Sequence, residues 1–396
     1  MYCNGTSTID SAPIQDEIVI SGISGRFSES DNVRHLKENL LNKVDLGSDD
    51  CRRWQHDHPD IPKRTGKVNN IEKFDAEYFD IPFNQAHLLD PMTRCLLERT
   101  YDAIVDAGIN PKDLRGTKTG VIVGTSFSES EIMLVYEKTQ VTDHGGLECR
   151  RSMQANWISH WLGVTGPSYT VDTACSSTMY AMEQAYRNIK FGQCDNMIVA
   201  ATNLCLNPVT SLQFMRLGVL SSDGFCKPFD INANGYMRSE AIRVVFLQKA
   251  KNAKRIYAIV IHCKTNCDGF KEEGITFPSI KMQSFLLQQF YDECNISPSV
   301  VAYVDAHGTG TKVGDPIEIN SIEKVFCKDR QGPLLISSSK SNTGHAEPAS
   351  GLLQIIKVLI TMETGIIPPN INITKERDDI EAFKRGTIRV VTTPTI

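Results

Sequence analysis

The stretch Asp172-Thr173-Ala174-Cys175-Ser176-Ser177 places a cysteine at the turn between an extended apolar run and a helical one. Residues 169–171 before it are β-prone, and residues 179–191 after it carry apolar side chains at helical spacing until Gly192 provides a stop. Cys175 is therefore expected at a helix N-terminus, where the helix dipole and unpaired backbone N–H groups favour a thiolate and can hold a developing oxyanion. The stretch thus predicts a strand, a turn with a reactive thiol, and a helix.

Two later stretches repeat this arrangement with a histidine in place of the cysteine. The first runs Val304-Asp305-Ala306-His307-Gly308-Thr309-Gly310-Thr311, where a strand ends on the histidine. The second runs Ser339-Lys340-Ser341-Asn342-Thr343-Gly344-His345, after the apolar residues 334–336 and before a helix that Pro348 opens at its first turn. The pattern predicts one histidine at a strand end and another at a helix entrance.

Each of the three residues, taken alone, has a more ordinary explanation. Free cysteines are among the most buried residue types, and an imidazole is often a satisfied structural group. The turn from Gly308 to Gly310 also lacks the spacing and the Lys-Ser/Thr ending of a phosphate-binding loop. The repetition of strand, reactive residue and helix at three places favours a catalytic interpretation.

Together these stretches resemble the β-ketoacyl synthases, the condensing enzymes of fatty-acid and polyketide assembly, whose site is one cysteine and two histidines. Cys175, His307 and His345 match that set residue for residue. The resemblance covers nearly the whole chain and is strongest to the ketoacyl synthase domain that begins the animal and insect type I fatty acid synthases. Five further stretches carry it: residues 64–67, 74–79, 90–92, 235–240 and 347–351.

The resemblance implies a condensation in three steps. Cys175 would take an acyl chain from a phosphopantetheine thiol, and His307 and His345 would stabilise the enolate formed when a malonyl thioester loses CO₂. The enolate carbon would then attack the Cys175 thioester and give a 3-oxoacyl chain two carbons longer. The substrates are acyl and malonyl thioesters of an acyl carrier protein or of CoA, and the resemblance implies neither a metal nor a redox cofactor.

Four further residues receive roles from the same resemblance. Lys340 and Glu318 are similar to a lysine and a glutamate that pair beneath the histidines and fix their orientation and protonation, although charged residues in general more often form solvated surface pairs. Thr309 and Thr311 are similar to hydroxyls that bind the pantetheine arm. A Gly-Thr-Gly-Thr turn could equally need these residues for its backbone geometry, so both interpretations stay open.

The fold class follows from alternating β-like and helical runs, which predict an α/β architecture with largely buried sheets. The resemblance implies a thiolase-like five-layered α-β-α-β-α sandwich of two similar halves, and a homodimer formed near the strand before Cys175. The β-like runs lie at residues 17–20, 120–124, 197–200, 244–247 and 256–261, and the helical ones include 88–107 and 281–294. The expected divisions are a flexible N-terminus (1–15), an N-terminal half (16–250), a C-terminal half (251–372) and the start of a C-terminal extension (373–396).

The composition favours a cytoplasmic enzyme. A formal charge of −5 and a pI near 6.0 give no electrostatic footprint for nucleic acid or an anionic membrane. The N-terminus is polar and lacks a signal core, and the longest apolar stretch, residues 352–362, is interrupted by Gln354 and Lys357 and is too short for a membrane span. The 12 cysteines lie scattered without paired CxxC spacing, as expected of reduced thiols rather than a disulfide framework or a metal site.

The leading hypothesis is the 3-oxoacyl-carrier synthase domain of a fatty acid synthase. An iterative polyketide synthase condensing domain uses the same three residues and is the alternative within the enzymes. Members of the family continue beyond the point that corresponds to Ile396 with a strand and a glycine-rich loop that gates the pocket, so a chain truncated before this loop is expected. A non-catalytic module that dimerises and docks a carrier protein is therefore the alternative outside the enzymes.

Overall fold

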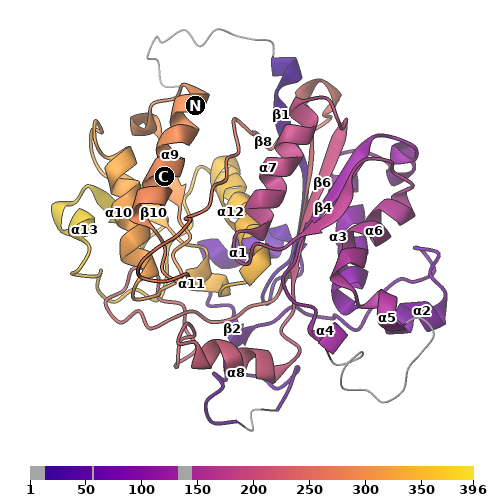
Figure 1. Cartoon of the computed structure of the whole chain (residues 1–396), viewed down its shortest axis with the longest axis horizontal. Coiled ribbons are helices and arrows are strands. Elements are labelled where there is room, and N and C mark those ends of the chain that lie inside the picture. The colour runs from indigo at the N-terminus through magenta and orange to yellow at the C-terminus, as the bar shows by residue number, and fades with distance from the viewer. Residues whose placement is uncertain (1–13, 56–57, 133–144) are drawn as a thin grey trace.

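Two main β-sheets alternate with layers of helices in the described part of the chain, and a short two-stranded sheet lies apart from them (Figure 1). The computed structural model describes residues 14–55, 58–132 and 145–396, so nearly all of the expected flexible segment 1–15 lies outside the described residues. In the part of the chain that is described, no helix combines the length and the apolar character that crossing a bilayer requires.

The larger sheet has six strands in the order β5-β4-β6-β7-β1-β8. These are β1 (Ile18–Arg26), β4 (Thr119–Gly124), β5 (Ser168–Val171), β6 (Asn196–Asn203), β7 (Ala241–Lys249) and β8 (Ala258–Ile259). β4 is parallel to β5 and β6, whereas β7 is antiparallel to β6 and β1. Helices α3 (Pro91–Asp106) and α6 (Arg151–Leu162) cover one face and α7 (Ser177–Lys190) the other (Figure 1). Because both faces are covered, β4 and β6 are buried along their whole length.

The smaller sheet has three parallel strands in the order β11-β10-β9: β9 (Tyr303–Asp305), β10 (Leu334–Ser337) and β11 (Ile388–Val390). Helix α12 (Ser350–Thr364) lies between the two sheets and contacts α7, β7 and β9. The outer helices of this half are α9 (Ile280–Cys294), α10 (Gly314–Phe326) and α13 (Glu381–Arg385). Buried side chains of α10 pack with those of β10 and β11 in one core cluster. The resulting order of helices, sheet, helices, sheet, helices confirms the five-layered prediction.

The remaining elements connect these layers. They are α1 (Val33–Leu41), α2 (Phe83–Leu88), α4 (Glu129–Glu131), α5 (Gly145–Glu148), α8 (Pro208–Arg216), α11 (Lys340–Thr343), the paired strands β2 (Gly47–Ser48) and β3 (Thr65–Gly66), and the 3₁₀ turns η1 (Ile14–Asp16), η2 (Pro111–Leu114), η4 (Ala250–Asn252), η5 (Pro298–Val300) and η6 (Glu347–Ala349).

Two predicted elements differ in the structure. The single helix expected over 88–107 is interrupted, because the Asp90 side chain accepts a hydrogen bond from Met92 N (2.8 Å) and starts a new helix with Pro91 at its first position. The strand expected over 256–261 is reduced to Ala258–Ile259. It pairs only with β1, and β1 begins at Ile18, so residues beyond Val260 have no strand partner there.

Candidate active site

Cys175 occupies a tight turn between β5 and α7. Asp172 Oδ1 accepts a hydrogen bond from Ala174 N (3.1 Å), and Ala174 has a φ of +50°, a conformation that residues with a side chain rarely adopt. Ser177 Oγ accepts from Thr173 N (2.9 Å) and donates to the Ala174 carbonyl (2.7 Å). Cys175 thus lies two residues before the first residue of α7, at the helix N-terminus expected from the sequence.

His307 follows the end of β9 and is held through its backbone. Glu318 on α10 accepts hydrogen bonds from the N–H groups of His307 (2.6 Å) and Gly308 (2.8 Å), while Lys340 Nζ donates to the His307 carbonyl (2.7 Å). The resemblance implied a direct pair between Lys340 and Glu318. Instead, Glu318 binds backbone N–H groups at His307 and Gly308 and Lys340 binds the His307 carbonyl. The two side chains interact with one another only electrostatically, at longer range.

His345 lies between α11 and η6 and is fully buried. Its N–H donates to the Met237 carbonyl (2.8 Å), and its carbonyl accepts from Ser239 N (3.0 Å). The ring of Tyr236 meets the imidazole edge-on, with 4.8 Å between ring centroids. Backbone pairing and ring packing therefore fix the position of this imidazole before any ligand arrives.

The fold brings the cysteine and the two predicted histidines into one cluster. His345 Nε2 lies 3.0 Å from Cys175 Sγ, and the two imidazole rings meet edge-on with centroids 5.3 Å apart. The sulfur and one nitrogen of each ring all lie within 4.8 Å of one another. Cys175 and His307 are partly buried and His345 is fully buried. A segment of the N-terminal half that carries Cys175 and two segments of the C-terminal half that carry His307 and His345 thus converge at one place.

The electrostatics of the cluster differ from the sequence prediction of a thiolate. Burial, together with the Glu347 carboxylate, raises the pKa of the Cys175 thiol to about 11, against a weaker opposing effect of Lys340. Burial and the Lys340 ammonium lower the pKa of His307 to about 3, and the same two causes hold the pKa of His345 well below its usual range. At neutral pH the cluster is therefore a protonated thiol facing neutral imidazoles.

One cysteine and two histidines are also donors that zinc accepts. The buried Lys340 ammonium lies close enough to lower the pKa of both imidazoles, and it would repel a metal cation by the same electrostatic effect. The cluster is therefore better suited to proton transfer than to metal binding.

The threonines of the Gly-Thr-Gly-Thr turn have local partners. The hydroxyls of Thr309 and Thr311 lie 3.2 Å apart, and Thr311 Oγ1 accepts from Gly314 N (3.2 Å). Gly308 has a φ of +41°, and a Cβ there would lie 2.7 Å from Ser338 Cβ. Turn geometry thus accounts for the glycine, and Thr309 and Thr311 lie on the same turn as His307.

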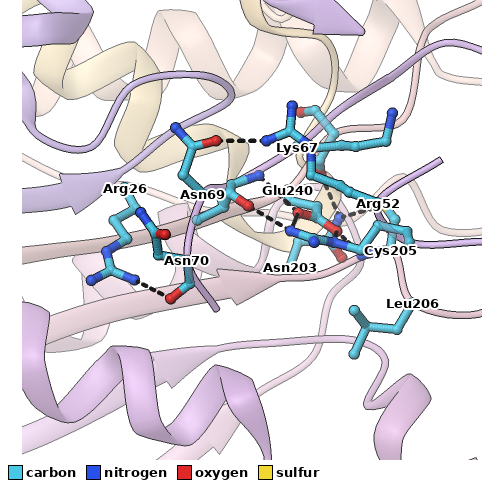
Figure 2. A network of polar contacts seen from close by, with 12 residues as sticks. Arg26, Arg52, Lys67, Asn69, Asn70, Asn203, Cys205, Leu206 and Glu240 are labelled. Carbon is cyan, nitrogen blue, oxygen red and sulfur yellow. Dashed lines mark hydrogen bonds and ion pairs between the residues drawn. The ribbon is translucent and has the colours of Figure 1, made fainter. Parts of the chain in front are cut away.

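Sequence reasoning assigned no role to residues 235–240, which the structure places against the site. The Glu240 carboxylate lies beside Cys205 and accepts a hydrogen bond from Cys205 N (3.1 Å) (Figure 2). It also accepts two hydrogen bonds from Arg53 (2.8 and 2.7 Å), and Asn203 Nδ2 donates to the Ser239 carbonyl (2.8 Å). This network anchors the backbone that pairs with His345. Arg238 and Glu240 directly precede the apolar run of β7 in the sequence. Because buried charges require partners, this position could have indicated a buried polar network.

A layered α-β-α-β-α fold with a cysteine and two histidines at its centre defines a condensing acyltransferase of the thiolase-like class. Comparison with known families agrees: residues 15–253 match the model described as "Beta-ketoacyl synthase, N-terminal domain" and residues 257–374 match "Beta-ketoacyl synthase, C-terminal domain". The chain belongs to the β-ketoacyl synthase family.

Individual relatives come from both branches of the family. A fatty acid synthase of Anser anser anser is 49% identical over 351 residues, which are 89% of this chain and 100% of that sequence. The highly reducing polyketide synthase virA of Hypocrea virens is 37% identical over 80% of this chain, which spans only 13% of that relative. Among solved structures, the ketosynthase from module 6 of the bacillaene synthase from Bacillus subtilis 168 has a TM-score of 0.88 at 33% identity, covering 96% of this chain and 67% of its own. The chain is thus a ketoacyl synthase domain close to that of fatty acid synthase.

Proposed function

We propose that this chain acts as the 3-oxoacyl-[acyl-carrier-protein] synthase domain of a fatty acid synthase, with Cys175 as the covalent acyl carrier. The proposal rests above all on the 3.0 Å contact between Cys175 Sγ and His345 Nε2, with His307 beside it. A nucleophile within hydrogen-bonding distance of a neutral base is the arrangement that thioester exchange requires.

The first step transfers an acyl group to the cysteine. Cys175 Sγ attacks the thioester carbonyl as His345 Nε2 takes the thiol proton, and the backbone N–H groups at the start of α7 favour the negative oxygen of the tetrahedral intermediate. Collapse of the intermediate breaks the bond to the carrier sulfur, which leaves as a thiol with the proton held by His345. The products are an acyl-Cys175 thioester and a free carrier thiol.

The second and third steps use both imidazoles as donors. The malonyl thioester loses CO₂, and the electron pair of the broken C–C bond forms an enolate whose oxygen accepts hydrogen bonds from His307 and His345. His345 Nδ1 makes no hydrogen bond to another described residue, so no partner locks the ring in one tautomer, and Nε2 can accept a proton in the first step and donate one here. The enolate carbon then attacks the acyl-Cys175 carbonyl, and collapse of the tetrahedral intermediate breaks the C–S bond. The released Cys175 thiolate takes up one proton from solvent, which restores the thiol.

The supporting residues have separate parts in this scheme. Lys340 and Glu318 fix the His307 backbone, and burial together with the Lys340 charge lowers the pKa of both imidazoles. Thr309 and Thr311 are proposed to bind the pantetheine arm, because they lie within four residues of His307 on the same turn. The substrates are accordingly acyl and malonyl groups carried on phosphopantetheine, with an acyl carrier protein as the partner.

A homodimer in the cytoplasm completes the proposal. β5 is a terminal strand of the larger sheet and leads directly to Cys175, so pairing with the β5 of a second copy would continue the sheet and satisfy the strand edge. The cysteines that the structure describes are all free, as expected in a reducing compartment.

The test is intact-mass spectrometry after incubation with an acyl-CoA. The wild-type chain should gain one acyl group on the Cys175 peptide, and Cys175→Ala should gain none there. Cys267→Ser removes an exposed cysteine and is the matched control, which should still be acylated at Cys175. A folded wild-type chain that stays unmodified would refute the covalent mechanism and favour the non-catalytic, carrier-docking alternative.

A polyketide synthase condensing domain is the second candidate, favoured by the 37% identity to a polyketide synthase. It would use the same chemistry at the same residues. Acylation rates with a series of straight and branched acyl groups separate the two candidates, because a fatty acid synthase domain should prefer straight saturated chains.

A further inference from the structure

A buried arginine joins the loop of His345 to helix α4. The Arg238 guanidinium donates to both carboxylate oxygens of Glu347 (2.8 and 3.2 Å) and to Glu129 Oε1 (3.2 Å). Its remaining terminal nitrogen donates to Ser211 Oγ (3.0 Å), and Phe214 lies against the guanidinium at 5.2 Å from the ring centroid. The side chains of Arg238 and Glu129 are 1% and 0% exposed, so solvent does not weaken these ion pairs.

The same arginine is linked to the candidate base through the backbone. Arg238 and His345 form a β-bridge, in which residues 237 and 239 exchange hydrogen bonds with the backbone of His345. Arg238 therefore holds the loop at two points, at His345 through the backbone and at Glu347 through the side chain.

Glu347 adopts a conformation that needs such support. Its φ is +45°, in the left-handed region where residues other than glycine are strained. The forked contact with Arg238 fixes both carboxylate oxygens in this conformation. No such fork would hold the side chain if the guanidinium were removed.

Glu347 also acts on the thiol. Its carboxylate raises the pKa of Cys175, whereas Lys340 lowers it, and the buried Tyr236 hydroxyl and the two imidazoles are the other titratable groups facing the sulfur. Arg238 supplies the positive charge closest to this carboxylate, so the effect of Glu347 on the thiol depends on its pairing with the guanidinium.

We propose that Arg238 is a positioning residue: its guanidinium fixes the loop that carries His345 and withholds the negative charge of Glu347 from the thiol. The inference deepens the proposed function, because it takes Cys175 and His345 as the reacting pair. It assigns a catalytic consequence to an ion-pair group that touches no substrate.

The experiment measures alkylation of Cys175 by iodoacetamide at pH 8, followed on its peptide by mass spectrometry. In Arg238→Met, Glu347 loses its counter-charge, and alkylation of Cys175 should slow by about threefold or more, since half a pKa unit changes the thiolate fraction about threefold. In Glu347→Gln the opposite change is expected, a rate about threefold above wild type. Glu363→Gln, on the exposed end of α12, is the matched control and should leave the rate unchanged.

The double variant Arg238→Met/Glu347→Gln separates positioning from simple stabilisation. Glu129 keeps two backbone partners, Leu206 N and Asn207 N, so removing Arg238 leaves Glu347 as the carboxylate that matters for the thiol. The double variant should recover a rate within about twofold of wild type, the coupling expected of residues in direct contact. A purely structural arginine would give a double variant at least as impaired as Arg238→Met.

Each outcome bears on one proposal. A folded Arg238→Met chain with the wild-type alkylation rate overturns the inference; if that variant does not fold, an unchanged rate in Glu347→Gln does so. Iodoacetamide needs no acyl substrate, so these rates can follow the expected order even where the wild-type chain fails to accept an acyl group. Failure of the wild-type chain to accept an acyl group would reject the proposed function, whereas alkylation rates in the expected order would still support the role of Arg238.

Discussion

At Cys175, burial and the helix N-terminus act in opposite directions. The start of α7 favours a thiolate. Burial of the thiol, and to a lesser extent the Glu347 carboxylate, oppose this effect and raise the pKa of the thiol to about 11. The buried His345 imidazole is neutral at the same time. In the proposed mechanism the nucleophile would therefore be generated when the proton moves to His345 during attack, from a resting site that pairs a protonated thiol with a neutral imidazole.

The pH dependence of Cys175 alkylation tests this neutral pair. With a pKa of about 11, only about 1 in 10,000 thiols is ionised at pH 7, and the rate should rise about tenfold per pH unit between pH 7 and 10. The measurement is the iodoacetamide rate on the Cys175 peptide over this range. The denatured chain provides the control, with a plateau above the ordinary thiol pKa of about 8.5. A plateau already reached at pH 8 in the folded chain would indicate a thiolate–imidazolium pair instead.

At the scale of single elements, the turn after β9 carries His307 and depends on Gly308. Alanine at this position must adopt a φ near +41° and bring Cβ within 2.7 Å of Ser338 and 2.9 Å of Phe229. We expect Gly308→Ala to lower the free energy of unfolding by about 2–4 kcal/mol and to slow condensation, because relief of the contact moves His307. The measurements are urea unfolding and the rate of 3-oxoacyl product formation.

Gly365 supplies the matched comparison for this turn. It ends α12 with a φ of +69°, and a Cβ there meets no atom within 4 Å. Gly365→Ala should therefore lose only the backbone contribution, about 1–2 kcal/mol, and keep its catalytic rate. Equal losses of stability and rate in the two variants would show that the contacts around Gly308 are unimportant.

The sequence predicted elements well where a single periodicity ran without interruption. β4, β6 and α9 agree with the predicted apolar runs to within a few residues. The two strands are buried along their whole length, and Leu287 and Tyr291 of α9 pack against the core of the smaller sheet. The break at Asp90 was missed because its capping role competes with a helical apolar pattern on both sides. The partners of Arg238 and Glu240 were missed for another reason: Glu129 and Glu347 each lie 109 residues from Arg238, and no local pattern identifies such contacts.

At the scale of the whole molecule, α12 connects the two halves. Leu352 and Leu359 belong to the same core cluster as strands β4, β6 and β7 of the larger sheet, while α12 also contacts β9 of the smaller one. Near Cys175, Thr178 Oγ1 donates to the Pro348 carbonyl (3.0 Å) and accepts from Gly351 N (3.1 Å). The reactive cluster therefore forms only where both halves are folded and α12 is in place.

This shared helix predicts that the described fold unfolds as one unit. Leu352 is fully buried, and Leu352→Ala should lower the free energy of unfolding by about 2–5 kcal/mol. Because α12 packs against both sheets, the loss should move a single transition, with fluorescence and circular dichroism giving the same midpoint. Met362→Ala, 61% exposed on the same helix, should change stability by less than about 0.5 kcal/mol. Two separate transitions, of which Leu352→Ala moved only one, would mean that each half folds independently and that the reactive cluster assembles by docking.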